Sequence, residues 1–342
     1  MDPHRLVIVI AGALLVAACG DDDNAPLMPK NDGGVSPVDA ASPSDAAPGT
    51  SGTWTAKKPL PKIKQELGVV ALGGKVYVLG GADDKTIFAE VDVYDPKTDT
   101  WSTAAPLPKP LHHINASVVN GRIWITGALE AFSFTAVGDT YVYDPATNTW
   151  TQKASMIGGS ERGASFVGAI GDVIYVAGGI RGGTVADVSA YDTAGDRWSA
   201  LPPLPVALDH GCSAVVNGVL YAIGGRGASI GGHTTRVDAL DPKSGAWLPR
   251  APMPTSRAGA ACAVVKDKVV VAGGEGNPKT ASGVFAEVEV FDPATNAWTS
   301  LPPMRTPRHG TAGATVDDIV YVPGGATKQG FGAVSDVEAL TF

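Results

Sequence analysis

The sequence predicts an all-β protein in which one four-stranded antiparallel unit occurs six times. Short apolar runs end in glycine pairs at Gly80-Gly81, Gly178-Gly179, Gly224-Gly225, Gly273-Gly274 and Gly324-Gly325, with a degraded copy at Gly127-Ala128. Tryptophans recur 47, 49, 48, 49 and 51 positions apart, at Trp54, Trp101, Trp150, Trp198, Trp247 and Trp298. Asp-Pro turns precede most of these tryptophans, at Asp95, Asp144, Asp241 and Asp292. A constant order of parts at a period near fifty residues indicates stacked supersecondary repeats.

Each repeat divides into four expected strands, named A to D in chain order. Strand A is a run of small residues such as Gly259 to Val265, and strand B runs into the glycine pair. Strand C leads to the Asp-Pro turn, whose residue types favour tight turns, and strand D starts at the tryptophan. Strands A and B are nearly continuously apolar, which is typical of a sheet that is covered on both faces. The glycine pair permits a close backbone approach that a Cβ would block.

This arrangement resembles the kelch family of β-propellers from about Thr53 to Phe342. The resemblance implies a six-bladed propeller with four antiparallel strands in each blade. Trp54 has no A, B or C strand before it, and the chain stops at Phe342 without a last D strand. We therefore expect Thr53 to Ala56 to form the outer strand of the sixth blade, which closes the ring and removes open sheet edges.

The segment before the repeats is typical of an exported, anchored protein. Residues 1–19 hold an apolar run, Leu6 to Val16, which is too short to span a bilayer and ends at Ala17-Ala18-Cys19. They resemble a bacterial lipoprotein signal, which implies lipidation of Cys19 and a place in the cell envelope; an ordinary secretory signal is the alternative. Residues 20–52 are Asp, Pro, Ala, Ser and Gly with few large apolar side chains, and are expected to be a disordered tether.

The charge pattern argues against nucleic acid as a partner. The net charge is −8, of which −5 lies between residues 20 and 52, so the repeats carry only −3. Such a surface has no basic footprint for nucleic acid. No phosphate loop, nucleophile elbow or HExxH motif occurs, so we expect neither a cofactor nor a metal. We also expect a monomer.

With antiparallel strands, the D–A and B–C loops emerge on one face of the ring. The A–B and C–D links are short, whereas the B–C loops are longer and irregular. They include 129–139 with Phe132 and Phe134, 227–236 with His233, and 275–286 with Phe285; Arg226 stands beside the second of these. Variable loops on a rigid scaffold are where binding is usually built, so we expect the ligand on this face.

Polar residues also recur at the start of strand A. The positions sixteen before each glycine pair include Lys64, Arg162, Arg257 and Arg308. The positions that follow include Glu66, His112, His113, Asp209, His210 and His309. In a propeller these should crowd the mouth of the central channel and bind ligand. The kelch resemblance offers an alternative for the arginines, which is that they bond carbonyl groups of adjacent blades.

The histidines and cysteines allow two further hypotheses that their spacing argues against. Three imidazoles near the axis could hold zinc or copper, but His112 and His309 are one register away from His113 and His210, and neighbours along a strand point to opposite sides. Cys212 and Cys262 are likewise offset by one position relative to their glycine pairs. We therefore expect two buried thiols rather than a disulfide.

Two functional classes remain. The first is a membrane-anchored module that binds a protein or glycan, which is what the kelch resemblance mostly implies. The second is a sugar-acting enzyme resembling bacterial sialic acid mutarotases. It would need a carboxylate and a cation at one anomeric centre, from Glu66 or Asp209 with His210 and from Arg162 or Arg257. Kelch copper oxidases are a weaker third resemblance, because no Tyr stands at the strand A mouth.

Overall fold

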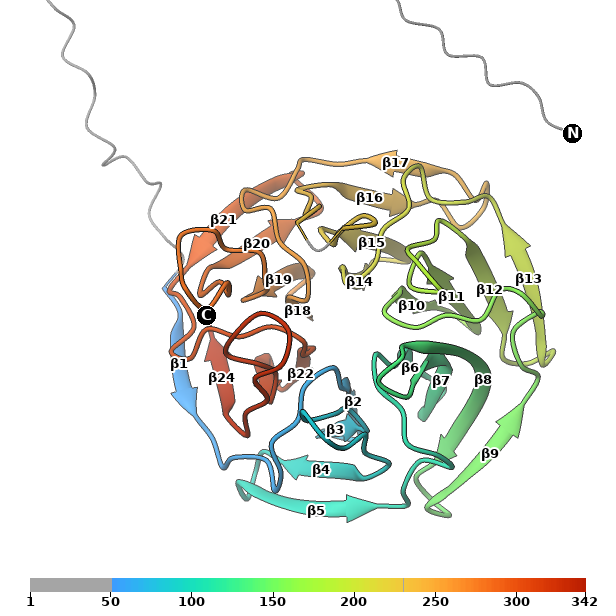
Figure 1. Cartoon of the computed structure of the whole chain (residues 1–342), viewed down its shortest axis with the longest axis horizontal. Coiled ribbons are helices and arrows are strands. Elements are labelled where there is room, and N and C mark those ends of the chain that lie inside the picture. Colours follow the sequence, from blue (N-terminus) through green and yellow to red (C-terminus); the bar gives the residue numbers. More distant parts are fainter. Residues whose placement is uncertain (1–50, 230) are drawn as a thin grey trace, which may run out of the picture. The chain divides into compact units, whose positions relative to one another are not determined.

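A computed structural model describes residues 51–229 and 231–342 of the chain. These residues form six four-stranded antiparallel sheets arranged around a central axis, which confirms the six-bladed propeller (Figure 1). They contain no helix, and hence none with the length and hydropathy of a membrane span. The expected signal segment 1–19, with its Cys19, and the expected tether up to residue 50 lie outside the described residues.

Each blade follows the predicted order from the axis to the rim. The A strands are β2 (Gly68–Leu72), β6 (Ala116–Val119), β10 (Phe166–Ile170), β14 (Cys212–Val216), β18 (Ala261–Val265) and β22 (Ala314–Val316). The B strands are β3 (Lys75–Leu79), β7 (Arg122–Glu130), β11 (Val173–Ala177), β15 (Val219–Ile223), β19 (Lys268–Ala272) and β23 (Ile319–Pro323). The C strands are β4 (Val91–Asp95), β8 (Thr135–Asp144), β12 (Val188–Asp192), β16 (Val237–Leu240), β20 (Val288–Asp292) and β24 (Val337–Thr341). The D strands at the rim are β5 (Thr100–Ala104), β9 (Thr149–Lys153), β13 (Arg197–Leu201), β17 (Trp247–Pro249), β21 (Ala297–Leu301) and β1 (Thr53–Ala56).

The N-terminal strand closes the ring as expected. β1 pairs with β24 in the sheet β1-β24-β23-β22, where Trp54 lies opposite Leu340. Trp54 is 8% exposed, and its indole N–H donates to the Pro302 carbonyl at 3.0 Å. In Figure 1 the blue β1 therefore lies against the red β24, beside the C-terminus.

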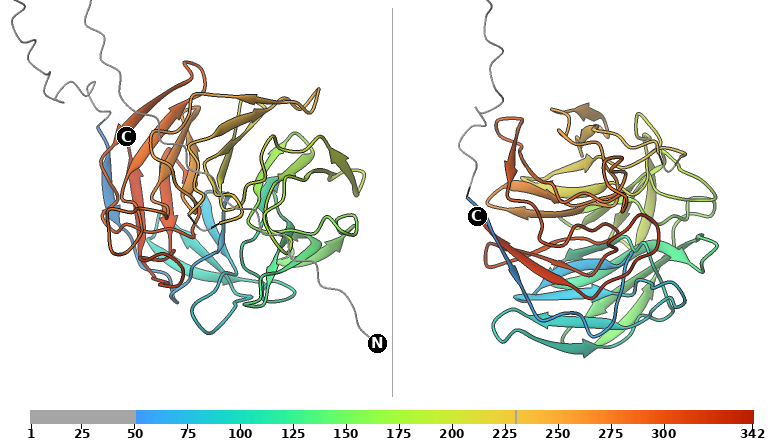
Figure 2. Two further views of the ribbon diagram at one scale, coloured as in Figure 1. Left: turned by 45° about the horizontal axis from the view of Figure 1, so that its top comes forward. Right: turned by 60° about the vertical axis from the view of Figure 1, so that its left-hand side comes forward.

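The core lies between blades rather than inside any one sheet. One cluster of buried side chains joins Ala261 and Val270 of the fifth blade to Val320 and Val322 of the sixth. Because strand neighbours point to opposite faces, alternate residues of one strand pack against the preceding and the following blade. The oblique views of Figure 2 show the blades stacked face to face around the axis in this way.

The glycine pairs connect consecutive blades. The second glycine of the first pair, Gly81, donates its backbone N–H to the Leu111 carbonyl of the next blade at 2.9 Å. A Cβ on Gly80, which has φ +53, would meet that same oxygen at 2.4 Å. Four further pairs make the equivalent bond to the next blade, which explains why both positions are glycine.

The second blade has Gly127-Ala128 in place of a glycine pair, and its structure differs from the prediction there. Residues 129–139 were expected to be a long loop, but β7 and β8 continue as a ladder until only 131–134 connect them, with a register shift between Thr126 and Ala128. Ala128 extends the strand because it does not take the turn that a second glycine takes elsewhere. The Asn115 side-chain amide then donates to the Arg162 carbonyl at 2.9 Å and replaces the missing bond.

The structure also corrects the prediction that the two cysteines are free thiols. The structure joins Cys212 to Cys262 in a disulfide, with a Cα–Cα distance of 5.6 Å. The offset of one position was interpreted as making them face different ways. Adjacent blades are stacked, however, so a side chain on the rear face of one blade meets one on the front face of the next. Opposite parity is therefore what brings the two sulfur atoms together.

A candidate ligand site at the channel mouth

Three consecutive registers at the start of the A strands point in three directions. The first register holds Lys64, Arg162, Arg257 and Arg308, whose side chains are fully buried inside their own blades. Arg308 donates to the Val322 carbonyl and to Glu338, both at 2.8 Å. Arg257 reaches the Val271 carbonyl at 3.1 Å and Glu289 at 2.9 Å. These cations brace strands A, B and C of one blade; they do not line the channel mouth, and the carbonyls that they bond belong to their own blade.

In the first, fifth and sixth blades the buried cation forms an ion pair with an acid on strand C. Lys64 pairs with Asp92 at 2.6 Å in the first blade. In the second blade the two places hold Leu111 and Thr140, both buried and uncharged. Arg162 bonds Ser189, and without a carboxylate partner its burial lowers its pKa to about 10. In the fourth blade Leu208 stands in the place of the cation, and the buried Asp238 on strand C pairs with Arg236 instead.

The second register faces the B–C loops. His112 and His309 form backbone bridges with Leu129 and Ala326, and their Nε2 atoms lie 3.0 and 2.9 Å from the carbonyl oxygens of Ala131 and Lys328. Asp209 occupies the same register in the fourth blade and accepts from Arg226 at 3.1 Å. This register therefore fixes the loops that surround the mouth.

The third register forms a closed ring around the axis. Each residue donates its backbone N–H to the carbonyl of the equivalent residue in the preceding blade, at 2.6 to 3.1 Å, through Glu66, His113, Ala164, His210, Gly259 and Gly310. All six have positive φ, from 49° to 64°. Glycine adopts this conformation without strain and holds two of the positions, and Ala164 holds a third with a side chain of one methyl group. Glu66, His113 and His210 are strained exceptions, and such exceptions concentrate at functional sites.

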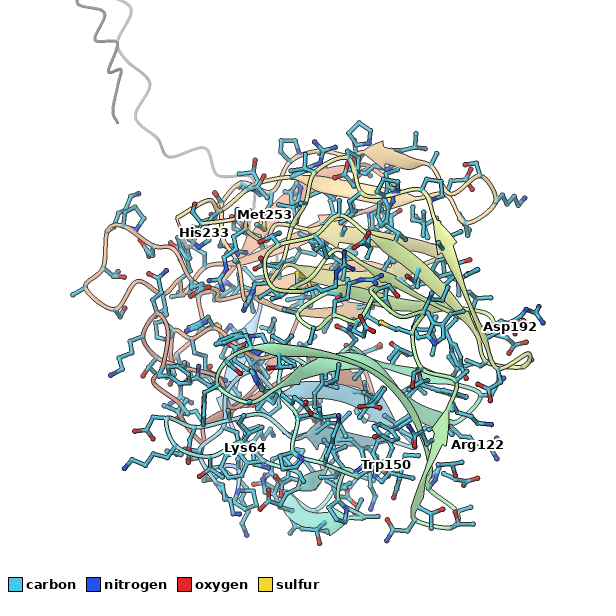
Figure 3. All side chains as sticks on the ribbon, turned by 45° about the vertical axis from the view of Figure 1, so that its right-hand side comes forward. Lys64, Arg122, Trp150, Asp192, His233 and Met253 are labelled. Carbon is cyan, nitrogen blue, oxygen red and sulfur yellow. A yellow bond between two sulfur atoms is a disulfide. The ribbon has the colours of Figure 1, made fainter. Side chains whose placement is uncertain are left out.

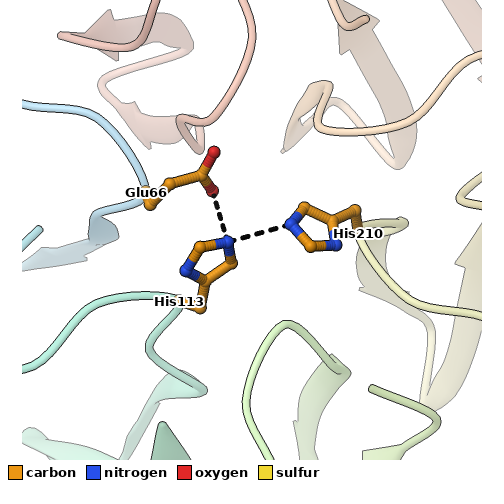
Figure 4. Close-up of side chains that lie close together, drawn as sticks. All are labelled: Glu66, His113 and His210. Atoms are coloured by element: carbon orange, nitrogen blue, oxygen red, sulfur yellow. Dashed lines mark hydrogen bonds and ion pairs between the residues drawn. The ribbon is translucent and has the colours of Figure 1, made fainter. Parts of the chain in front are cut away.

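These three exceptions meet on the axis (Figure 4). His113 Nε2 lies 3.1 Å from Glu66 Oε2 and 2.9 Å from His210 Nε2. Burial and the neighbouring His210 and His112 hold the pKa of His113 well below its usual value. The offset of one register predicted that His113 and His210 point in a different direction from His112 and His309, and the structure agrees. The sequence analysis did not predict that Glu66 lies beside His113 and His210.

A second layer of charge supports this cluster. Asp209 Oδ1 accepts from His210 Nδ1 at 2.6 Å, and Arg226 bridges Asp209 and Glu275. Burial alone would raise the pKa of Asp209, but bonds from His210 and Thr184 and the charge of Arg226 lower it. Asp209 is therefore a carboxylate at neutral pH.

Two cavities meet at the cluster. A narrow channel of about 190 Å³ runs between the A strands, and a wider pocket of about 500 Å³ opens above it. Glu66, His113 and His210 line both, so they form the floor of the pocket and the top of the channel. Phe132, Phe134 and Phe331 line the wider pocket.

Two of the remaining candidates lie outside the mouth pocket, whereas Phe134 lines it. His233 and Phe285 line a separate pocket, with Lys279, and Figure 3 shows His233 well apart from Lys64. Burial and the charge of Arg226 and His210 lower the pKa of His233, against the effect of Glu275. Phe285 was expected to be a loop side chain with little core packing, but it is only 6% exposed. Phe134 is half-buried and its ring lies 5.3 Å from that of His113.

Several pocket residues were not among the sequence candidates. Gln65 bonds the backbone of Gly330 and Gly332 and holds the loop that carries Phe331. Glu275 follows its glycine pair directly, as Arg226 does, whereas the other repeats have Ala, Leu or Ile in this place. Two charged residues at a position that is otherwise apolar are a signal in the sequence from which Glu275 could have been found.

The described residues form a six-bladed propeller with a pocket at its channel mouth. The profile of the KLHDC2/KLHL20/DRC7 Kelch-repeats domain matches residues 48–179 and 160–325. The chain belongs to the kelch-repeat family, whose propellers commonly serve as protein-binding modules.

Similar proteins include Kelch-like protein terF of Aspergillus terreus, 34% identical over 289 residues, which are 82% of this chain and 53% of the fungal protein. Kelch-like protein 15 of Danio rerio is 39% identical over 93 residues, which are 27% of this chain and 15% of that protein. The chain thus spans about half the length of the first relative and less of the second. The solved structure of YjhT shares the fold, with a TM-score of 0.71 at 16% identity over 84% of this chain and 97% of that one.

Proposed function

We propose that this chain is a ligand-binding propeller that takes one residue of a protein, or one sugar of a glycan, into the pocket at its channel mouth. The observation that carries the proposal is the pocket itself, with an aromatic rim above a floor of ionisable groups. Its volume of about 500 Å³ falls within the roughly 300–1,000 Å³ of typical ligand sites.

The phenylalanines at the edge of the mouth pocket supply the contact surface. Phe132 and Phe331 come from different blades, are each 42% exposed, and lie with ring centroids 6.0 Å apart. The two rings contact each other edge to face, and exposed aromatic side chains at the edge of a pocket give a ligand apolar area at small entropic cost. The polar groups at the floor of the pocket can orient a ligand, because Glu66 offers a hydrogen-bond acceptor and Arg226 a donor to hydroxyl, amide or ionic groups.

The test is capture of ligands by matched variants. The full chain is used against a glycan array and against secreted proteins, together with Phe331→Ser and a control, Leu248→Ser. Leu248 is 46% exposed on the rim strand β17, away from the pocket. We expect Phe331→Ser to weaken binding by about tenfold, an energy of about 1.4 kcal/mol that is common for an interface aromatic. Equal affinity of wild type and Phe331→Ser, or an equal loss in the control, would contradict the proposal.

We further propose that the protein is exported and anchored in the cell envelope through Cys19. The sequence of residues 1–19 supports this, and so does the disulfide between Cys212 and Cys262, because disulfides persist in oxidising compartments. Metabolic labelling with a fatty acid should mark the wild-type chain, and Cys19→Ser should lose both label and membrane association. Membrane association that survives in Cys19→Ser would argue against the anchor.

A second candidate is an enzyme that acts on sugars. The observation that favours it is the convergence of Glu66, His113 and His210 on one pocket, which offers general acid and base groups. The cation would have to be Arg226, because Arg162 and Arg257 lie inside their blades. Mutarotation of free sugars that is lost in Glu66→Gln, while sugar binding persists, would establish this class; no turnover by wild type would dismiss it.

A further inference from the structure

The hydrogen bonds around the axial cluster fix which ring nitrogens carry hydrogen. His210 Nδ1 lies 2.6 Å from Asp209 Oδ1. An ionised carboxylate only accepts, so Nδ1 of His210 is the atom that carries hydrogen. The Arg226 guanidinium, which can only donate, has its Nη2 atom 3.3 Å from His210 Nε2, so Nε2 is an acceptor. The lone pair of His210 is therefore on Nε2.

The same reasoning applies on the other side of the axis. His112 Nε2 lies 3.0 Å from the Ala131 carbonyl oxygen, which also only accepts, so His112 carries its hydrogen on Nε2. Its Nδ1 is then an acceptor, and His113 Nδ1, 2.5 Å away, donates to it. The lone pair of His113 is therefore also on Nε2.

These assignments direct three electron-pair donors at one another. The two Nε2 atoms lie 2.9 Å apart, and Glu66 Oε2 lies 3.1 Å from that of His113. Arg226 Nη2 also approaches His210 Nε2, at 3.3 Å, whereas the two atoms that contact His113 Nε2, namely His210 Nε2 and Glu66 Oε2, are both acceptors in this assignment. Converging lone pairs with no donor between them need a cation.

We propose that Glu66, His113 and His210 form a binding site for a divalent transition metal ion, with Zn²⁺ as the best fit. Two imidazoles and one carboxylate are ligands that Zn²⁺ prefers, and three protein ligands leave a further position open. The three ligand atoms lie within 4.8 Å of one another. All three residues line the mouth pocket and also the narrow channel below it.

Two further features show that the site is built. Each imidazole is oriented by an outer partner, His210 by Asp209 and His113 by His112, as metal-bound histidines usually are. The other three places in the ring hold Ala164, Gly259 and Gly310. A Cβ on Gly310 would meet Glu66 Oε1 at 2.6 Å, so the small residue makes room for the glutamate. This inference does not depend on which ligand the pocket takes.

The test is metal binding by the full chain after treatment with a chelator and dialysis. Zn²⁺ is titrated by calorimetry, and bound metal is counted by mass spectrometry. We expect one Zn²⁺ per chain in the wild type, and Co²⁺ in its place should give visible absorption. His113→Ala, His210→Ala and Glu66→Gln should lose stoichiometric binding. Asp209→Asn, which removes an orienting group, should bind about 10–100-fold more weakly.

The controls separate loss of metal from loss of fold. Ala164 already occupies the same backbone conformation at φ 54°, so alanine at position 113 or 210 is tolerated there. His233→Gln removes an imidazole that lies outside the cluster and should keep one Zn²⁺ per chain. Zn²⁺ should raise the melting temperature of wild type and His233→Gln, but not of folded His113→Ala.

Four outcomes would overturn the proposal. The wild type could bind no Zn²⁺, which would mean that a shared proton holds the cluster together. His113→Ala combined with His210→Ala could keep stoichiometric binding, or His233→Gln could lose it. Binding of Ca²⁺ in preference to Zn²⁺ would also contradict a site that has two imidazole ligands.

Discussion

Adjacent residues at the start of each A strand separate stability from function. Arg308 points into its blade and ties three strands together, whereas the next residue, His309, contacts a loop. The residue after that lies in the axial ring and, in three blades, points a functional group at the pocket. A change of one position therefore moves a side chain from core to loop to site.

The buried arginines give the first prediction. Arg308→Met should lower the free energy of unfolding by about 3–5 kcal/mol, because it leaves the Glu338 carboxylate buried without its partner. Chemical denaturation measures this, with the exposed Arg305→Met as control. The double variant Arg308→Met with Glu338→Leu should recover much of the loss. A single variant as stable as the control would show that the ion pair does not brace the blade.

The second prediction concerns how the stability of the fold changes at acidic pH. Asp99 accepts from Tyr94 and from the Lys58 N–H, and Asp196 from Tyr191 and the Ala154 N–H; these bonds lower both pKa values. A carboxyl whose pKa is lower in the folded state stabilises the fold above its unfolded pKa, about 3.9, and that contribution disappears as pH falls toward the folded value. The melting temperature should therefore decrease below about pH 4.

The second blade has asparagine at the position of these two aspartates, which suggests the variant that tests this prediction. Asn148 accepts from Tyr143 in the equivalent position, so an amide fits there. Asp99→Asn combined with Asp196→Asn should keep the fold and flatten the acid limb of the melting curve between about pH 4 and pH 2. If the double variant and the wild type lost stability in parallel, these two carboxylates would not be responsible.

At the scale of elements, neighbouring blades are held together by backbone hydrogen bonds and, in one place, by a disulfide. The glycine pair donates a backbone N–H to the following blade, and the residues of the axial ring donate theirs to the preceding blade at the channel. Between the fourth and fifth blades the contact is covalent, because β14 and β18 carry Cys212 and Cys262. Alternating strand faces explain this pairing, which the spacing in the sequence concealed.

The disulfide gives a prediction at this scale. It joins residues that are 50 apart, and loop-closure entropy assigns such a link about 4 kcal/mol of stability. Cys212→Ala combined with Cys262→Ala should lower the free energy of unfolding by about that amount. Dithiothreitol should destabilise the wild type to the same level and leave the double variant unchanged. A wild type that is indifferent to reductant when unfolded and refolded would contradict the disulfide.

For the whole molecule, the ring could be predicted from the sequence and its site only in part. Tryptophan spacing determined the number of blades, and Trp54, with no earlier strands, located the closure. Counting back from the glycine pairs found His113 and His210, but not that Arg257 points inward while Glu66 points to the axis. That distinction depends on the positive φ of the axial ring, which no single residue type reveals because Glu and His replace Gly there.

The central claim is that the mouth pocket, and not the rim of the ring, receives the ligand. A photo-crosslinking side chain placed at Phe331, at Phe132 and at Leu248 of the full chain tests it in the producing cells, with adducts identified by mass. We predict that positions 331 and 132 both capture the same partner and that position 248 captures none. Crosslinks that form equally well from position 248, or only from there, would contradict the account.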